Sequence, residues 1–300
     1  IRSLTTDQLN SLETGEIAAL KTNQIAALAT EQVAGLDTAS IVALNSAQVA
    51  SLTTAQLNAL STDQLNAIDA SDMKALKNTQ LLALTTDQLK GLTTDDIREL
   101  SATQLQLLNT EQMNALTTDQ LNALDTAVFK TLKTSQIASL STDQLNGLDS
   151  ESISSLTSAQ LSALTTLQIN NLATEQLDAL NSAQLGSLTT SQIKALTTDQ
   201  LNALESSDLA ALKTSQIAAL TTEQIQGLDS DSMVALTSAQ VGALTTAQLG
   251  VLTTEQLNSI ETDEIAMLKT SQIAALSTDQ LKGLDTDAIK AMTSSQVSAL

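Results

Sequence analysis

Apolar residues recur along this chain with a period of eight. Leu occupies position 4 and nearly every eighth position after it, up to Leu300. We call these residues anchors, and a second apolar residue follows each anchor after five positions, as Leu9 follows Leu4. From Leu4 to Leu300 this gives (300 − 4)/8 = 37 octads in one unbroken frame. The conservative replacements among the anchors are Ile68, Ile260 and Met292.

Neither a long helix nor a strand fits this spacing. Eight residues at about 100° each advance about 800°, so the apolar stripe of a continuous helix would rotate by about 80° per octad. A strand needs alternation with period two, which apolar spacings of five and three do not give. The chain is therefore expected to bend once in every octad.

A helix start is visible at each bend. Thr or Ser stands two residues after the anchor in 34 of the 37 octads, as Thr6 and Ser46 do. A hydroxyl at this place, followed in many octads by an acidic residue, is typical of a helix N-cap. Where a Thr also precedes it, Thr117 and Gln120 predict a capping box. We expect each octad to form a helix of about six residues that ends at the next Leu-Thr bend.

Helices this short are unstable alone and persist only when packed. Coiling of the chain would bury both apolar rows between successive turns, which is the architecture of a solenoid. The sequence therefore predicts an all-α fold, a continuous solenoid over residues 1–300 as a single domain. The chain starts without Met and its pattern is uninterrupted at Leu300, so we expect it to be a segment of a longer protein.

The positions of the glutamines show a second, longer period. Gln stands four residues after the anchor in 27 octads and is missing from ten. Five of the ten are followed by an octad that opens with Lys, and we call them first-class octads; they start at Leu12, Ile68, Leu124, Leu204 and Ile260. The other five are preceded by Gly, and we call them second-class octads; they start at Leu36, Leu92, Leu148, Leu228 and Leu284. Both classes step by seven, seven, ten and seven octads.

This long period predicts the size of a turn. Within each group of seven octads, the special octads are the first and the fourth. The apolar residues along the seam of a coiled coil are spaced by three and four residues in the same way. By analogy we infer about 3.5 octads, or about 28 residues, per turn, with the special octads along one edge. A wider coil of seven octads per turn with two edges is the alternative. The single step of ten octads adds three octads and resembles a stammer, expected to rotate the edge within about residues 156–203.

The predicted edge is acidic. Twenty of the 33 Asp and Glu residues fall in the ten special octads, and the candidate site residues are Glu13, Glu16, Asp69, Asp72, Asp95, Asp96, Asp149, Glu151, Asp229, Asp231, Glu261, Glu264, Asp285 and Asp287. Three interpretations compete. The edge is a solvated face, or a lateral contact surface, or a weak site for Ca²⁺, although no EF-hand loop occurs. The lysines available for a lateral contact are Lys21, Lys77, Lys133, Lys213 and Lys269.

The remaining composition excludes several functions. The chain has no His, Cys, Tyr, Trp or Pro, so no base is present to activate a Ser or Thr nucleophile, and we expect neither an enzyme nor a small-molecule substrate. A net charge of −20 predicts repulsion from nucleic acid. No apolar run approaches the length of a membrane span, so no membrane insertion is expected. The retained glutamines are expected to satisfy backbone groups at the bends.

Two resemblances arise from the octad. LTTDQLNAL at residues 116–124 and LTSAQVGAL at residues 236–244 resemble the opening helix of the TAL-effector repeat. That likeness covers one helix only, without the base-reading loop. Unbroken arrays similar to LTTDQ-[LIV]-x-x-L occur in very large repetitive bacterial proteins with adhesin-like or surface roles. This second resemblance covers the whole chain and implies an extracellular or cell-surface location.

The sequence as a whole predicts a structural repeat protein. We expect an extracellular rod about 100 Å long, since turns stack at helix-packing distances of about 10 Å. It would serve as a stalk or filament body of a bacterial surface protein and self-associate laterally. The alternative is a binding scaffold whose acidic edge takes up Ca²⁺ or a basic partner. Ice binding by the Thr rows is a third hypothesis, and no cofactor other than Ca²⁺ is expected.

Overall fold

The computed structural model describes all 300 residues, Ile1–Leu300, and places one short α-helix in each octad. Each helix has four to six residues. By their contacts the helices form two units, Ile1–Ser155 and Leu156–Leu300.

The helices of the first unit are α1 (Thr6–Asn10), α2 (Thr14–Ala18), α3 (Thr22–Ala26), α4 (Thr30–Ala34), α5 (Thr38–Val42), α6 (Ser46–Val49), α7 (Thr54–Ala59), α8 (Thr62–Asn66), α9 (Ala70–Met73), α10 (Asn78–Leu81), α11 (Thr86–Gly91), α12 (Thr94–Glu99), α13 (Ala102–Leu107), α14 (Thr110–Ala115), α15 (Thr118–Asn122), α16 (Thr126–Phe129), α17 (Thr134–Ile137), α18 (Thr142–Asn146) and α19 (Ser150–Ser155).

The helices of the second unit are α20 (Ser158–Ala163), α21 (Thr166–Asn170), α22 (Thr174–Asp178), α23 (Ser182–Leu185), α24 (Thr190–Ala195), α25 (Thr198–Ala203), α26 (Ser206–Ala211), α27 (Thr214–Ile217), α28 (Thr222–Gln226), α29 (Ser230–Val234), α30 (Ser238–Val241), α31 (Thr246–Gly250), α32 (Thr254–Ser259), α33 (Thr262–Met267), α34 (Thr270–Ile273), α35 (Thr278–Gly283), α36 (Thr286–Ala291) and α37 (Ser294–Val297).

The helices begin one residue earlier than the sequence pattern predicted. The hydroxyl two residues after the anchor, such as Thr118, is the first helical residue and not the cap. The cap is the residue directly after the anchor, because only there does an extended backbone precede the first turn, as at Thr117 with φ −76° and ψ 162°. The capping box is confirmed, since the Thr117 side chain accepts from the backbone N–H of Gln120 and Gln120 accepts from that of Thr117.

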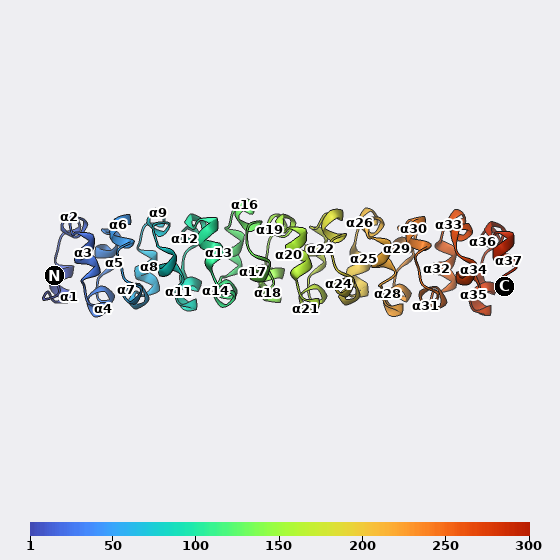
Figure 1. Cartoon of the computed structure of the whole chain (residues 1–300), viewed down its shortest axis with the longest axis horizontal. Helices are drawn as coiled ribbons and strands as arrows, with labels where there is room; N and C mark the ends of the chain where they lie inside the picture. The colour runs from blue at the N-terminus through green and yellow to red at the C-terminus, as the bar shows by residue number, and fades with distance from the viewer. The chain divides into compact units, whose positions relative to one another are not determined.

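Most helices pack against the helix three octads further along the chain. In the first unit α4 contacts α7 and α11 contacts α14, and in the second unit α21 contacts α24 and α29 contacts α32 (Figure 1). Helices that are third neighbours in sequence therefore lie on successive turns. The solenoid prediction is confirmed, with about 3.5 octads per turn, and the alternative of seven octads per turn is wrong because it would separate these helices.

The glutamines fix the length of the turn. Gln120 Nε2 donates to the carbonyl of Leu92, 28 residues earlier, at 2.7 Å, and to that of Leu89 at 2.9 Å. Its Oε1 accepts from the N–H of Thr117 at 2.8 Å. The same set recurs in both units, for example at Gln56 and Gln248, so one buried amide joins its own helix start to the bend on the turn before. The predicted role of Gln at the bends is confirmed.

The core consists of the two apolar rows. Anchors such as Leu116 and second-row residues such as Leu121 are almost fully buried, and Phe129 fills a second-row place with no exposure. Burial of one such side chain contributes about 1.5–3 kcal/mol. The rows become partly exposed only in the first and last turns, as at Leu4 and Val297, because no further turn covers them there.

The three extra octads between the special octads at Leu148 and Leu204 do not change the local packing of the second unit. Third-neighbour contacts continue through that region, from α20 with α23 to α24 with α27. The expected rotation of the edge within residues 156–203 stays a prediction. Among all the helices, none has the length and apolar character needed to cross a bilayer.

Candidate functional site: the acidic edge

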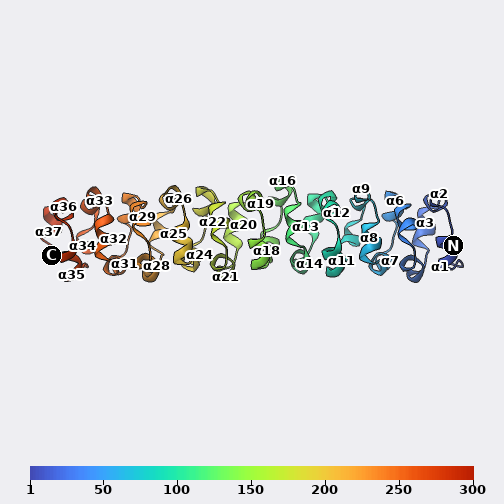
Figure 2. The same cartoon turned by 180° about the vertical axis from the view of Figure 1, so that it is seen from behind.

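The special octads come together in pairs. Each first-class helix contacts the second-class helix three octads later: α2 with α5, α9 with α12, α16 with α19, α26 with α29, and α33 with α36. Within the first unit α2, α9 and α16 lie on the same side in both views (Figures 1 and 2), as do α26, α33 and α36 within the second unit. In each unit the paired helices form the surface that we call the acidic edge.

At each pair, a side-chain amide from the octad before the first-class helix bonds to the backbone at the start of the second-class helix. Asn122, one octad before α16, donates from Nδ2 to the carbonyl of Gly147 at 2.9 Å, and its Oδ1 accepts from the N–H of Asp149 at 3.0 Å. Asn10, Asn202 and Asn258 make both of these bonds, and Asn66 makes the first. In an ordinary octad the Gln accepts from the N-cap N–H. In the second-class octads where the Asn makes both bonds, the Asn accepts from the N-cap N–H instead, so no Gln is needed for that bond.

The glycine before each second-class octad is required by space. A Cβ at Gly147 would lie 2.5 Å from Thr118 Cγ2, and the same conflict occurs at Gly35, Gly91, Gly227 and Gly283. The φ of Gly147 is −88°, an ordinary value for any residue. Close approach of a Thr from the turn before, and not backbone conformation, therefore selects Gly.

Acidic residues take the place of Gln in most first-class octads. Asp208 accepts from the hydroxyl of Ser182 at 2.8 Å, 26 residues earlier, and Asp72 accepts from that of Ser46. In the octad of α16 the residue at this place is Val128, and the position 26 residues before it is Ala102. A polar pair is thus replaced by an apolar pair at equivalent positions, which explains two departures from the octad pattern.

Most of the predicted site residues act within the fold. Asp69, Asp149, Asp229 and Asp285 are N-caps whose carboxylates accept backbone N–H groups. Glu16 accepts from the N–H of Glu13. Asp95 pairs with Arg98 at 2.7 Å, and Asp287 pairs with Lys290 at 3.3 Å. Glu151 and Asp231 lie in the first turns of their helices, and Glu261 is an exposed N-cap residue without a side-chain cap.

Three acids of the edge, Asp96, Asp208 and Glu264, are buried at Gln positions. Burial raises the pKa of Asp96, which is 2% exposed, while hydrogen bonds from Thr93 act in the opposite direction. Burial likewise raises the pKa of Glu264, against hydrogen bonds from Ser238 and from the backbone of Glu261. The carboxyls of Asp96 and Glu264 are therefore easier to protonate than an exposed acid.

The five lysines of the predicted lateral contact make no salt bridge within the chain. They are the N-cap residues of α3, α10, α17, α27 and α34, and their side chains provide no cap. One ion pair joins the two helices of a special pair, between Lys74 and Glu99 at 2.9 Å. The acidic edge of the same chain therefore does not hold these five ammonium groups, and their pairing with another chain stays a prediction.

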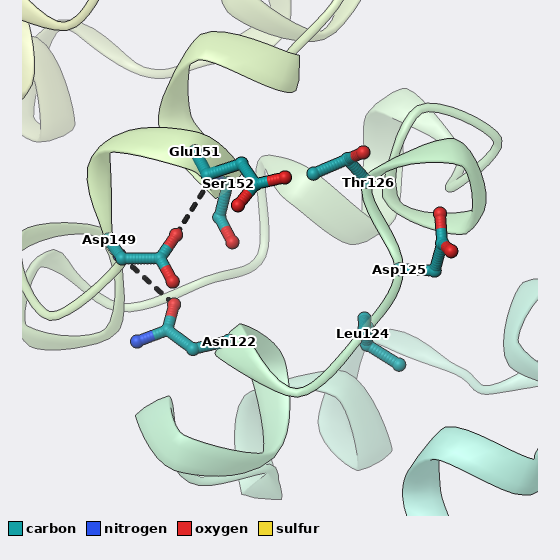
Figure 3. A pocket seen from close by; sticks show the side chains of 7 residues that line it. All are labelled: Asn122, Leu124, Asp125, Thr126, Asp149, Glu151 and Ser152. Atoms are coloured by element: carbon teal, nitrogen blue, oxygen red, sulfur yellow. Dashed lines mark hydrogen bonds between the residues drawn. The ribbon is translucent and has the colours of Figure 1, made fainter.

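No three acidic side chains lie close enough together to hold a metal ion. The acidic edge does contain a pocket of about 140 Å³ between α16 and α19, lined by Asn122, Leu124, Asp125, Thr126, Asp149, Glu151 and Ser152 (Figure 3). Two shallower hollows border other special helices, one between α33 and α36 and one between α29 and α32. Calcium binding at the candidate acids stays a prediction.

The five asparagines that bond to the start of the second-class octads were missed in the sequence analysis. Asn10, Asn66, Asn122, Asn202 and Asn258 follow the same steps of seven, seven, ten and seven octads as the special octads. This periodicity was the available signal. It is hidden because Asn also occupies the equivalent place in ordinary octads, as Asn58 and Asn114 do.

These contacts define the class of the protein, an α-solenoid built from octapeptide repeats and closed turn by turn through buried Gln amides. The chain belongs to the ALTTAQ repeat family. The model of that repeat matches residues 9–46, 33–69, 65–97, 92–126, 122–158, 169–206, 201–238, 233–262 and 257–294. A search of curated proteins found no match.

Proposed function

We propose that this chain is the structural repeat segment of a bacterial surface or secreted protein, where it forms an extracellular rod, stalk or filament body. The observation that supports the proposal is the Gln bond to the bend 28 residues earlier, as from Gln120 to Leu92 and from Gln248 to Leu220. Each turn is bonded to the turn before it, so the stability is a sum of contributions from neighbouring turns. The solenoid can therefore be extended by adding turns of the same kind. Such a protein serves as a spacer and not as a catalyst.

The acidic edge fits this role as a lateral surface. Its acidic residues, together with the five lysines that have no ion-pair partner in the chain, recur every seven octads over most of the sequence. Equal spacing of opposite charges favours side-by-side association of copies, because several contacts form at once.

Small-angle X-ray scattering tests the rod. At high salt, where laterally associated copies are expected to dissociate, we expect a cross-section of one solenoid turn and a maximum dimension of about 100 Å, given about 10 Å per stacked turn. A scattering curve of a compact sphere would contradict the proposal. The location is tested separately in cells that make the full-length protein, by labelling intact cells with an antibody to this segment. Labelling only after lysis would contradict an extracellular role.

A further inference from the structure

The pocket between α16 and α19 is lined by a hydroxyl that is open to an entering group, that of Ser152. Ser152 is 2% exposed, and its Oγ makes no hydrogen bond, although its N–H donates to Asp149 at 2.8 Å. The equivalent hydroxyl of Ser232 donates to Asn202 at 3.2 Å. Figure 3 shows the side chains of Ser152 and Glu151 among those that line the pocket.

The carboxylates of this pocket lack a cation from their own chain. Asp125, Asp149 and Glu151 line it, and none of them forms a salt bridge. Two other special pairs supply their own cation. At α9 and α12, Lys74 pairs with Glu99 and Arg98 pairs with Asp95, and at α33 and α36, Lys290 pairs with Asp287. The position of Arg98 and Lys290 is taken by Ser154 in α19.

The pocket fits an ammonium group better than a metal ion. A divalent ion such as Ca²⁺ needs several oxygen ligands at about 2.3–2.6 Å, and no three acids of this chain are grouped in that way. A lysine ammonium carries three donors on a long stem, which can reach carboxylates and a hydroxyl set further apart. The free Ser152 hydroxyl is an acceptor suited to such a donor.

We propose that the pocket between α16 and α19 binds the Lys133 ammonium of a second copy of this chain. Lys133 is exposed, has no ion-pair partner in the chain, and opens the octad that directly follows α16, the helix on one side of the pocket. In an isologous two-fold pair each copy inserts Lys133 into the pocket of the other, and the contact is made twice. This inference rests on the lateral association within the proposed function and names its contact.

Sedimentation velocity of the 300-residue chain tests the contact. We expect the wild type to dimerise at low salt and to dissociate at high salt. Glu151→Lys and Lys133→Glu are each expected to weaken dimerisation at least about tenfold, and an equimolar mixture of the two variants is expected to restore it, because the charges are then exchanged across one contact. The matched controls are Glu111→Lys, at the same helix position in an ordinary octad, and Lys194→Glu, and both are expected to dimerise as the wild type does.

Circular dichroism shows that each variant keeps its helices, and Glu151→Gln provides a milder change. A monomeric wild type, or variants that dimerise unchanged, would overturn the proposal. A wild-type chain that stays monomeric but binds a lysine-rich peptide would overturn the second copy as the occupant. None of these results alters the scattering of a rod, so failure here is distinguishable from failure of the proposed function.

Discussion

In most ordinary octads one glutamine side chain serves both its own helix and the turn before. Gln120 is 2% exposed, accepts from Thr117 and donates to Leu89 and Leu92. Replacement of this amide leaves buried backbone groups without partners, each at a cost of about 1–3 kcal/mol.

Gln120→Ala is therefore expected to lower the free energy of unfolding by about 2–5 kcal/mol, since up to three bonds are lost. Denaturant unfolding measures the total, and hydrogen exchange of the Thr117 amide locates the effect, because repeat arrays can open locally. The neighbour Asp119, which is not buried, provides the control, since Asp119→Ala is expected to stay within about 0.5 kcal/mol. A fully tolerated Gln120→Ala would contradict the role assigned to the amide.

Glu264 predicts a pH dependence with a definite sign. Burial raises its pKa in the folded chain, so its contribution to stability is present below the unfolded pKa and is lost as the pH rises through the folded value. Glu264→Gln is expected to raise the Tm at neutral pH, because the amide can also donate to the turn before. The gain is expected to vanish near pH ~4, where the carboxyl is protonated.

The control for this experiment is Glu255→Gln, an exposed acid in the first turn of α32. It is expected to show no comparable gain at neutral pH. Thermal unfolding followed by circular dichroism between acid and neutral pH separates the two variants. A Glu264→Gln chain with the same pH profile as the wild type would contradict burial as the cause.

At the scale of the element, a pair of special helices depends on how closely one turn approaches the next. Asn122 joins Gly147 to the start of α19, and Thr118 occupies the space where a Cβ of residue 147 would lie. The second-class signature of Gly before Leu-Asp is thus a packing requirement between turns.

Gly147→Ala is expected to destabilise the first unit by about 1–3 kcal/mol, because the new methyl group meets Thr118 Cγ2. Gly15→Ala has open space around its Cβ and is expected to stabilise by about 0.5 kcal/mol, since Ala is the better helix former. The double variant Gly147→Ala with Thr118→Ser removes the methyl group and is expected to recover most of the loss. Denaturant unfolding of the four chains checks this order.

At the scale of the whole molecule, the octad is the unit of insertion and deletion. Every ordinary octad offers the same anchor carbonyl and the same Gln amide, so removal of one whole octad brings equivalent groups into contact. Removal of half an octad shifts apolar and polar positions against each other on every later turn.

Deletion of residues 189–196, which has the length of one ordinary octad, is therefore expected to keep the helix content per residue and a cooperative unfolding transition. Deletion of residues 189–192 is expected to lower both, since the rows of α24 and later helices lose register with the turn before. Circular dichroism and calorimetry compare the two chains. Equal stability of the two deletions would contradict a fold based on octad register.

The sequence by itself determined the fold class, the octad helix, the turn of three and a half octads and the special octads. These follow from local periodicity, because every octad repeats one set of apolar and capping residues, and because Gln marks each place where a buried amide is needed. It placed the cap one residue late, since Thr-Thr pairs such as Thr117 and Thr118 offer two hydroxyls and only the backbone decides between them.

Only the tertiary structure decided which distant residues meet. Three features depend on contacts between successive turns or on the space between two turns. Asn122 bonds to both Gly147 and Asp149, and Ser182 donates to Asp208. Ser152 and Glu151 line one pocket. In the sequence these contacts are visible only as a shared period of seven octads. This period shows that the positions belong together but not which atoms touch. The physical reason is that the distance between turns, and not the local helix, selects Gly, Asn and Ser at these positions.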